Sequence, residues 1–293
     1  MKLPVYHRQR FILFLLEIAG GELSRMDLQK LIFLHEEEQN SGHFNFIPYH
    51  YGAYSFQCAD DLDLLEKRGW ISKEGEHNIG LVQSLPSDPR GNQVRSELRE
   101  WLPSHKERGN NLVKYTYLNY PWFAQNSRMK DSLLSRKELN AIPNATTNEI
   151  PTVQSIGYEG ISFEGYVNQL ILNQTATLCD VRRNPLSRKF GFSKDSLARI
   201  LPKIGIEYKH IPELGIISEK RRALDTRADY DELFAEYRES LPNRREALEN
   251  LCEIVKHDGA VALTCFEADP TYCHRHCVTE WLETNKAFPV QHL

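Results

Sequence analysis

Short apolar segments alternate with helix-like segments throughout the second half of the chain, and this alternation constrains the fold more than any other feature. Buried strands are predicted at residues 152–156, 176–181, 206–211 and 260–266. Helical patterns lie among them, at residues 163–172, 194–201, 230–237 and 244–257. Strands that alternate with helices are typical of an α/β domain. We therefore predict a mostly parallel sheet flanked by helices.

The first half has another pattern. Helices are predicted over residues 7–19, onward from a Ser24 cap, and over 56–67, before a short strand at Trp70–Ile71. This order is that of a winged-helix-like α+β domain. Further helices are predicted near 93–101 and 136–139, and prolines and asparagines then indicate a linker. The predicted organisation is a winged-helix-like domain with a helical extension at 1–140, a linker at 141–151 and the α/β domain at 152–293.

Composition excludes several classes of protein. The 293 residues are 41% hydrophobic, which is enough to build packed cores. The longest apolar run, Phe11–Leu16, is far shorter than the roughly 18 residues of a membrane span. No signal-peptide pattern follows the charged start, and six cysteines are too few for a secreted disulfide scaffold. We therefore expect a reduced cytoplasmic protein without a membrane partner.

Positive charge is concentrated in one segment of an acidic chain. Residues 182–222 contain eleven lysines and arginines against four acids, a local charge of +7, whereas the whole chain carries −4. Such an island favours a local anionic partner, a nucleotide or nucleic acid. A solvated basic face explains the charge equally well.

The predicted winged-helix-like region carries a further set of motifs. These are Leu28–Leu34, Tyr51–Ser55 and Asp61–Ile71. They resemble winged-helix-like antitoxin and regulator domains of the Panacea/SocA type, with Ala53 where the tyrosine-glycine-proline turn of those domains has proline. Up to Trp70 there are seven lysines and arginines against ten acids, which weakens the case for DNA binding and leaves contact with a protein, or a regulatory role, at least equally well supported.

Polar residues follow each predicted strand of the second half. In open α/β sheets, ligands bind beyond the carboxyl ends of the strands, so these residues form the candidate site. The residues predicted to bind substrate are Gly157, Tyr158, Glu159, Gly160, Arg182, Arg183, Ser187, Arg188, His210 and Glu213. The residues predicted to be catalytic are Asp180, Cys265, Glu267, Cys273, His274 and Arg275. The Gly157 and Gly160 glycines are expected to let backbone amides approach a ligand.

Each reactive group has a plainer alternative. Cys265 is a core residue, a nucleophile or a metal ligand. Cys273 is placed near the start of the last helix, where the helix dipole would lower its thiol pKa. Asp180 and Glu267 are candidate acid–base groups, or Asp180 forms an ion pair with Arg182 or Arg275.

Metal and phosphate sites are also possible from the same residues. Cys265, Cys273 and Cys277 with His274 or His276 offer ligands for zinc, although their spacing matches no standard zinc motif. We therefore predict no cofactor and keep zinc as the alternative. Arg182, Arg188 and Arg275 are predicted to form a phosphate clamp, since guanidinium groups bind phosphate in a bidentate way. Surface ion pairs are the alternative for these arginines.

Six ordered motifs of the second half carry a family resemblance. They are Ser155–Gly160, Cys179–Arg188, Gly191–Lys194, Gly205–Tyr208, Pro212–Gly215 and Cys265–Pro270 with Cys273–Arg275. Over about residues 152–285 the chain resembles the domain of unknown function 488 family. The resemblance implies an α/β domain with a site made of cysteine, acid and a Cys-His-Arg motif.

These features together predict a two-domain protein. The α/β domain is expected to carry an enzyme-like site that acts on or senses a phosphate-bearing substrate, and the winged-helix-like domain is expected to regulate it. Whether the site is catalytic is left open. The alternatives are a regulator or defence-associated module that binds DNA or protein without catalysis, and a structural zinc module.

Overall fold

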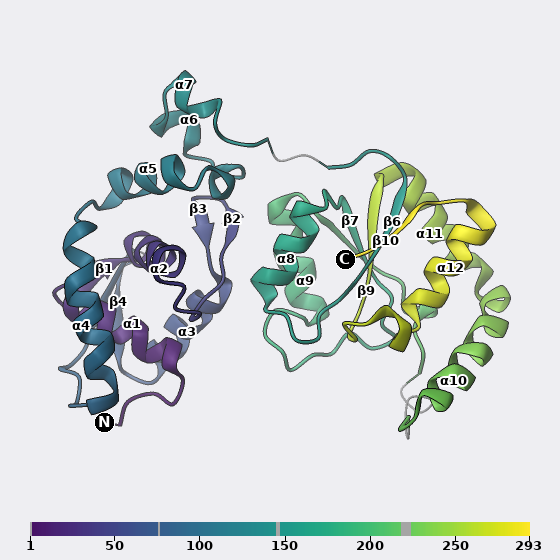
Figure 1. The fold of residues 1–293 in the computed structure, drawn as a ribbon, viewed down its shortest axis with the longest axis horizontal. Helices are drawn as coiled ribbons and strands as arrows, with labels where there is room; N and C mark the ends of the chain where they lie inside the picture. The colour runs from purple at the N-terminus through teal and green to yellow at the C-terminus, as the bar shows by residue number, and fades with distance from the viewer. Residues whose placement is uncertain (1, 76, 145–146, 218–223) are drawn as a thin grey trace. The chain divides into compact units, whose positions relative to one another are not determined.

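The computed structural model describes residues 2–75, 77–144, 147–217 and 224–293. The chain divides into two compact units, Met1–Ala145 and Thr146–Leu293 (Figure 1). The predicted linker at 141–151 spans this division, and its residues 145–146 lie outside the described residues. So do the basic-island residues Glu219, Lys220, Arg221 and Arg222. No helix of the described residues is long and apolar enough to cross a membrane.

The first unit combines helices with small antiparallel sheets. Its principal helices are α1 (His7–Ile18), α2 (Arg25–Gln39), α3 (Phe56–Lys67), α4 (Asn92–Trp101) and α5 (Gly109–Asn119), followed by the short α6 (Lys130–Leu133) and α7 (Arg136–Leu139). Its strands are β1 (Glu22–Ser24), β2 (Ile47–Tyr49), β3 (Gly52–Tyr54), β4 (Ile71–Glu74) and β5 (Asn78–Leu81). They form an antiparallel sheet of order β1-β5-β4 and the separate pair β2-β3.

Side-chain caps and an apolar core define the helices of this unit. The Ser24 hydroxyl accepts a hydrogen bond from the Asp27 amide at the start of α2, and Ser55 does the same for Cys58 in α3. Residues 28–35 of α2 are all buried, so this helix passes through the middle of the core.

The second unit contains a five-stranded parallel sheet. Its strands are β6 (Thr152–Gly157), β7 (Thr177–Asp180), β8 (Glu207–His210), β9 (Ala260–Cys265) and β10 (Val290–His292). The strand order is β10-β6-β9-β7-β8, and every neighbouring pair is parallel. The prediction of a mostly parallel sheet flanked by helices, next to an α+β region, is therefore confirmed.

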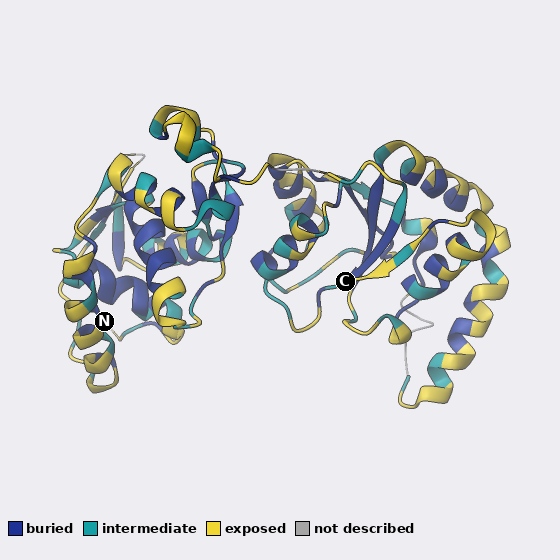
Figure 2. Ribbon diagram, turned by 45° about the horizontal axis from the view of Figure 1, so that its top comes forward, coloured by how far each residue is buried: buried dark blue, intermediate teal, exposed yellow. Residues whose placement is uncertain are grey.

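Helices cover both faces of this sheet. They are α8 (Phe163–Leu172), α9 (Lys194–Ile200), α10 (Arg227–Ser240), α11 (Arg245–Asp258) and α12 (Arg275–Lys286). Helices α8 and α9 lie on one side, and α10, α11 and α12 lie on the other (Figure 1). The central strands are buried, while the helices present exposed faces outward (Figure 2).

The alternation of side chains along a strand decides which helices each residue meets. Val261 and Leu263 of β9 pack in one core with residues of α10, α11 and α12. Thr264 faces the other side, where its hydroxyl accepts a hydrogen bond of 2.8 Å from Tyr166 of α8. Cys265 follows the parity of Leu263, so its thiol lies on the α12 side of the sheet.

Candidate functional site

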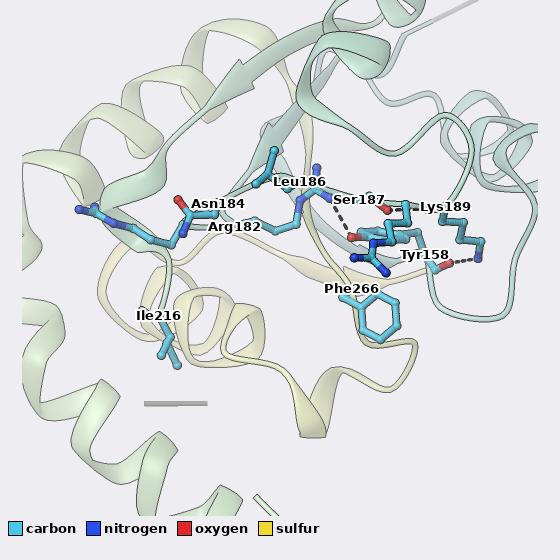
Figure 3. A pocket seen from close by; sticks show the side chains of 10 residues that line it. Tyr158, Arg182, Asn184, Leu186, Ser187, Lys189, Ile216 and Phe266 are labelled. Carbon is cyan, nitrogen blue, oxygen red and sulfur yellow. Dashed lines mark hydrogen bonds between the residues drawn. The ribbon is translucent and has the colours of Figure 1, made fainter. Parts of the chain in front are cut away.

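A cavity of about 440 Å³ lies beyond the carboxyl ends of β6, β7 and β9 (Figure 3). Its lining residues come from the segments that follow these three strands, and Ile216 comes from the segment after β8. They are Tyr158, Arg182, Arg183, Asn184, Leu186, Ser187, Arg188, Lys189, Ile216 and Phe266. The predicted site residues among them are Tyr158, Arg182, Arg183, Ser187 and Arg188. Among the described residues, none that lines the cavity is acidic, and four are basic.

Arg182 is held in place by a buried ion pair with Asp180. Its Nε and Nη2 atoms lie 2.8 and 2.5 Å from the two carboxylate oxygens, and its Nη1 donates to the Tyr158 hydroxyl at 2.8 Å (Figure 3). Burial alone would lower the pKa of Arg182, but the hydrogen bonds and charge of Asp180 raise it above its ordinary value. Tyr208 also donates to Asp180, at 2.8 Å. The ion-pair alternative for Asp180 is therefore the arrangement present, and this fully buried carboxylate does not line the cavity.

The other three cations of the cavity form no such pair with an acid among the described residues. Arg183 and Arg188 are exposed, and Arg183 donates to the Pro212 carbonyl at 3.3 Å. Lys189 donates to the carbonyl oxygen of Tyr158. Partial burial lowers the pKa of Lys189, and the charge of nearby Glu159 opposes that shift. These side chains leave positive charge available to a ligand.

Aromatic rings form one wall of the cavity. Tyr158 stacks on Phe192 with ring centroids 4.4 Å apart, and the Phe266 ring meets it edge-on at 5.3 Å. Tyr158 is buried, whereas 42% of Phe266 is exposed. Phe266 and Lys189 were not predicted from the sequence as site residues. Phe266 stands between the predicted residues Cys265 and Glu267, and Lys189 follows the predicted Arg188, so their positions next to predicted residues could have indicated both.

The Gly157–Gly160 turn packs against the segment that follows β9. A Cβ atom on Gly157 would lie 1.8 Å from the Glu267 carbonyl oxygen, so this position requires glycine. The Tyr158 and Glu159 amides donate to the Phe266 carbonyl at 3.0 and 2.9 Å. The prediction that this turn offers amides to a ligand is wrong for these two groups, because the segment after β9 already uses them.

Two thiols and an imidazole form a buried group beside the cavity. Cys265, Cys273 and His274 are each at most 2% exposed. The Sγ atoms of Cys265 and Cys273 lie 3.8 and 3.9 Å from His274 Nδ1, and the three ligand atoms lie within 4.8 Å of one another. The Cys265 thiol lies 3.4 Å from Glu267 Oε2. We call Cys265, Cys273 and His274 the thiol cluster.

Burial reverses the pKa shift predicted for Cys273. The residue precedes α12, but its thiol is enclosed by protein, and this desolvation raises its pKa. The neighbouring Cys265 and the charge of Glu267 act in the same direction. The expected lowering by the helix dipole is therefore wrong, because loss of water outweighs it.

Arg275 does not belong to a phosphate clamp. Its side chain is buried, and Nη1 and Nη2 donate to the Glu267 and Ala268 carbonyls at 2.5 and 2.9 Å. Its Nε donates to the Ser155 hydroxyl at 3.3 Å. The guanidinium thus fixes the segment after β9, and of the predicted three-arginine clamp only Arg182 and Arg188 line the cavity.

His210 and Glu213 also lie away from the cavity lining. His210 Nε2 lies 2.9 Å from the Arg182 carbonyl, and its Nδ1 lies 3.3 Å from Lys194 Nζ. The Glu213 side chain is exposed, and its backbone carbonyl accepts a hydrogen bond from Arg244 at 2.7 Å. His210 therefore contacts the backbone of the segment after β7 and does not line the cavity.

Comparison with known families agrees with part of the predicted resemblance. The model of a family described as a domain of unknown function, DUF488, matches residues 162–282. The matched segment starts just before α8 and ends within α12, so it includes the basic cavity residues and the thiol cluster. No curated protein and no solved structure matches the chain.

Proposed function

We propose that the second unit binds a phosphate-bearing ligand, a nucleotide, in the cavity beyond β6, β7 and β9. The observation that supports this most is the cavity lining, which contains Arg183, Arg188 and Lys189 and, among the described residues, no acid. Three cations around one cavity, with no acid among its described lining residues, attract an anionic ligand.

Each wall of the cavity suits one part of a nucleotide. Guanidinium groups of Arg183 and Arg188 offer paired donors to phosphate oxygens, and Lys189 adds a compact charge. The exposed ring of Phe266 offers a face on which a base stacks. A cavity of about 440 Å³ falls within the range of small-molecule sites.

Arg182 has a different role in this proposal. Because Asp180 neutralises it and Tyr158 and Phe192 accept its remaining hydrogen bonds, it positions the aromatic wall rather than supplying free charge. Among the acid–base candidates, Asp180 is committed to this pair, while Glu267 directly follows Phe266. Glu267 Oε2 lies 3.4 Å from the Cys265 thiol and not in the cavity lining, so we assign no proton transfer to either carboxylate.

Calorimetric titration of the full chain tests the proposal. The ligands are nucleoside mono-, di- and triphosphates, with the free nucleoside and inorganic phosphate for comparison. Arg183→Gln and Arg188→Gln are each expected to weaken binding about tenfold, a loss of about 1.4 kcal/mol. Arg245→Gln removes an exposed arginine of α11, which pairs with Glu249 away from the cavity lining, and is the matched control, expected to bind as the native chain does.

Salt dependence and ligand choice decide the outcome. Binding that weakens as salt rises, and that both cavity variants reduce, supports the proposal. Equal binding by both variants and the native chain, or absence of binding by any nucleotide or single-stranded oligonucleotide, overturns it. Tighter binding of an oligonucleotide than of a mononucleotide would identify a nucleic-acid strand as the ligand.

A second proposal concerns the first unit, which we infer to be a winged-helix-like module that contacts protein. The order α1-β1-α2-β2-β3-α3-β4-β5, with sheet order β1-β5-β4, supports the winged-helix-like description, and the β2-β3 pair is an insertion between α2 and α3. Helix α3, in the position of a recognition helix, carries Asp60, Asp63 and Glu66 at its surface, while its Asp61 is buried and paired with Arg8. These acids disfavour a DNA phosphate backbone. Salt-dependent binding of duplex DNA that α3 substitutions such as Asp63→Asn change would contradict this inference.

A further inference from the structure

We propose that Cys265, Cys273 and His274 bind one zinc ion, with Glu267 as the fourth ligand. Two thiolates, an imidazole and a carboxylate form a ligand set typical of zinc. This site is separate from the cavity proposed above, and the proposal does not depend on nucleotide binding.

The spacing of the ligand atoms fits tetrahedral coordination. Zinc–sulfur and zinc–nitrogen bonds of about 2.3 and 2.0–2.1 Å place sulfur and nitrogen about 3.6 Å apart in a tetrahedron. The two sulfur–nitrogen distances here are 3.8 and 3.9 Å. Oε2 of Glu267 lies 3.4 Å from the Cys265 sulfur, so this carboxylate is the nearest candidate for a fourth ligand. Cys265, Cys273 and His274 need only small shifts, whereas Glu267 is not among the residues whose ligand atoms all lie within 4.8 Å of one another, so its carboxylate has to turn toward the cluster to complete the site.

The partner of the other imidazole nitrogen sets the tautomer that zinc needs. His274 Nε2 lies 3.1 Å from the Val181 carbonyl oxygen. A carbonyl only accepts hydrogen bonds, so Nε2 carries the proton and Nδ1 presents its lone pair toward the two sulfurs. A backbone carbonyl that orients a histidine from behind is the usual outer-shell partner of a metal-bound imidazole.

Rigid elements hold the four ligands. Cys265 ends the central strand β9, and Tyr237 packs edge-on against His274 with ring centroids 5.5 Å apart. Arg275 fixes the intervening segment through the Glu267 and Ala268 carbonyls. A bound ion would therefore tie the end of β9 to the start of α12, and its charge would stabilise two buried thiolates together.

A neighbouring group of similar composition is a weaker candidate. His276, Cys277 and Glu280 also lie within ligand distance of one another. However, Arg238 donates to Glu280 at 2.9 Å, and its guanidinium lies 3.0 Å from His276 Nε2. A cation already occupies the ligand face of this group, which makes Cys277 a useful control.

Metal analysis of the full chain, purified under reducing conditions, is the first test. We expect about one zinc ion per chain. Cys265→Ala and Cys273→Ala are expected to lose it, whereas Cys277→Ala and Cys179→Ala, which removes a buried thiol of β7, are expected to retain it. Loss of metal from the two control variants to the same degree would overturn the assignment.

A second test needs no variant to fold. Zinc is removed from the native chain with a chelator and replaced by cobalt, which is expected to give a thiolate-to-metal charge-transfer band and tetrahedral ligand-field bands.

In the variant series, Glu267→Gln is expected to keep the charge-transfer band but to weaken zinc affinity about tenfold or more. A reduced native chain that binds neither zinc nor cobalt contradicts the proposal, as does a Cys265–Cys273 disulfide in freshly purified chain. Unaltered nucleotide binding in either case would leave the proposed function intact.

Discussion

The cavity and the thiol cluster lie next to each other, but their polar side chains differ in exposure to solvent. The cavity exposes Arg183 and Arg188 without an acid among its described lining residues, whereas the cluster encloses Cys265, Cys273 and His274 almost completely. Phe266 lines the cavity directly after Cys265, and the Val181 carbonyl that orients His274 directly precedes Arg182. Functional and structural roles therefore alternate between adjacent residues.

This contrast explains why so many reactive residues of the second unit are not at the cavity. Asp180, Arg275 and His210 direct their hydrogen bonds to the framework that positions the cavity wall. Among the described residues, Arg183, Arg188 and Lys189 of the cavity lining form no ion pair with another described residue, so we propose that their charge meets the ligand. The following substitutions distinguish the residues that stabilise the fold from the residues proposed to contact the ligand.

The largest effect is expected from Asp180→Asn. Removing one partner of a buried ion pair leaves the Arg182 charge unpaired and costs about 3–5 kcal/mol of folding free energy. Urea denaturation followed by circular dichroism measures this loss. Tyr208→Phe removes one hydrogen bond to the same carboxylate and is expected to cost about 1 kcal/mol. Equal stability of Asp180→Asn and the native chain would show that the pair does not support the cavity.

Gly157→Ala is expected to disturb both regions together. Its methyl group would clash with the Glu267 carbonyl, displacing the segment that carries Phe266 and Glu267, at a cost of about 1–3 kcal/mol. Gly160→Ala is the matched control: Gly160 has a φ of +73°, but no atom lies within 4 Å of the place that an added methyl group would take, so a smaller loss is expected. Nucleotide affinity and zinc content, measured on the same samples, should both fall for Gly157→Ala; an effect on only one would separate the two regions.

Phe266→Ala is expected to distinguish the base from the phosphate. Stacking on an aromatic ring contributes about 1–3 kcal/mol per base, so nucleotide affinity should fall about tenfold or more. Affinity for inorganic pyrophosphate should be unchanged, because the cations remain. Titration calorimetry with both ligands measures the difference. A parallel loss for both ligands would mean that Phe266 shapes the cavity without touching a base.

The smallest effect is expected from Cys179, a buried thiol outside the cluster. Burial raises its pKa to about 12, whereas an unfolded cysteine has a pKa of about 8.5. As pH rises above that value the unfolded chain loses a proton that the folded chain keeps, so stability falls by about 1 kcal/mol between about pH 7.5 and 9.5. Cys179→Ala should remove this part of the pH dependence in urea denaturation. An unchanged slope would show that Cys179 ionises alike in both states.

Sequence patterns predicted the α/β architecture well because three of the four predicted strands, β6, β7 and β9, are buried in the sheet interior and alternate with helices. The three-residue strands β1, β2, β3 and β10 were missed, since segments that short carry no periodic signal. Three of the four basic cavity residues, Arg182, Arg183 and Arg188, were predicted because parallel strands bring their carboxyl ends to one edge. The partner of each charge could not be predicted: that Arg275 meets backbone carbonyls, and that Cys273 loses contact with water, depends on packing between segments distant in sequence.

Diffraction from crystals of the full chain grown with a nucleoside triphosphate analogue, with anomalous data at the zinc edge, tests the central distinction most directly. We predict phosphate density between Arg183, Arg188 and Lys189, with the base on Phe266. The anomalous peak is predicted among Cys265, Cys273 and His274. Phosphate density at the thiol cluster, or an empty cavity at saturating ligand, would contradict the separation of a cationic binding site from a buried metal site.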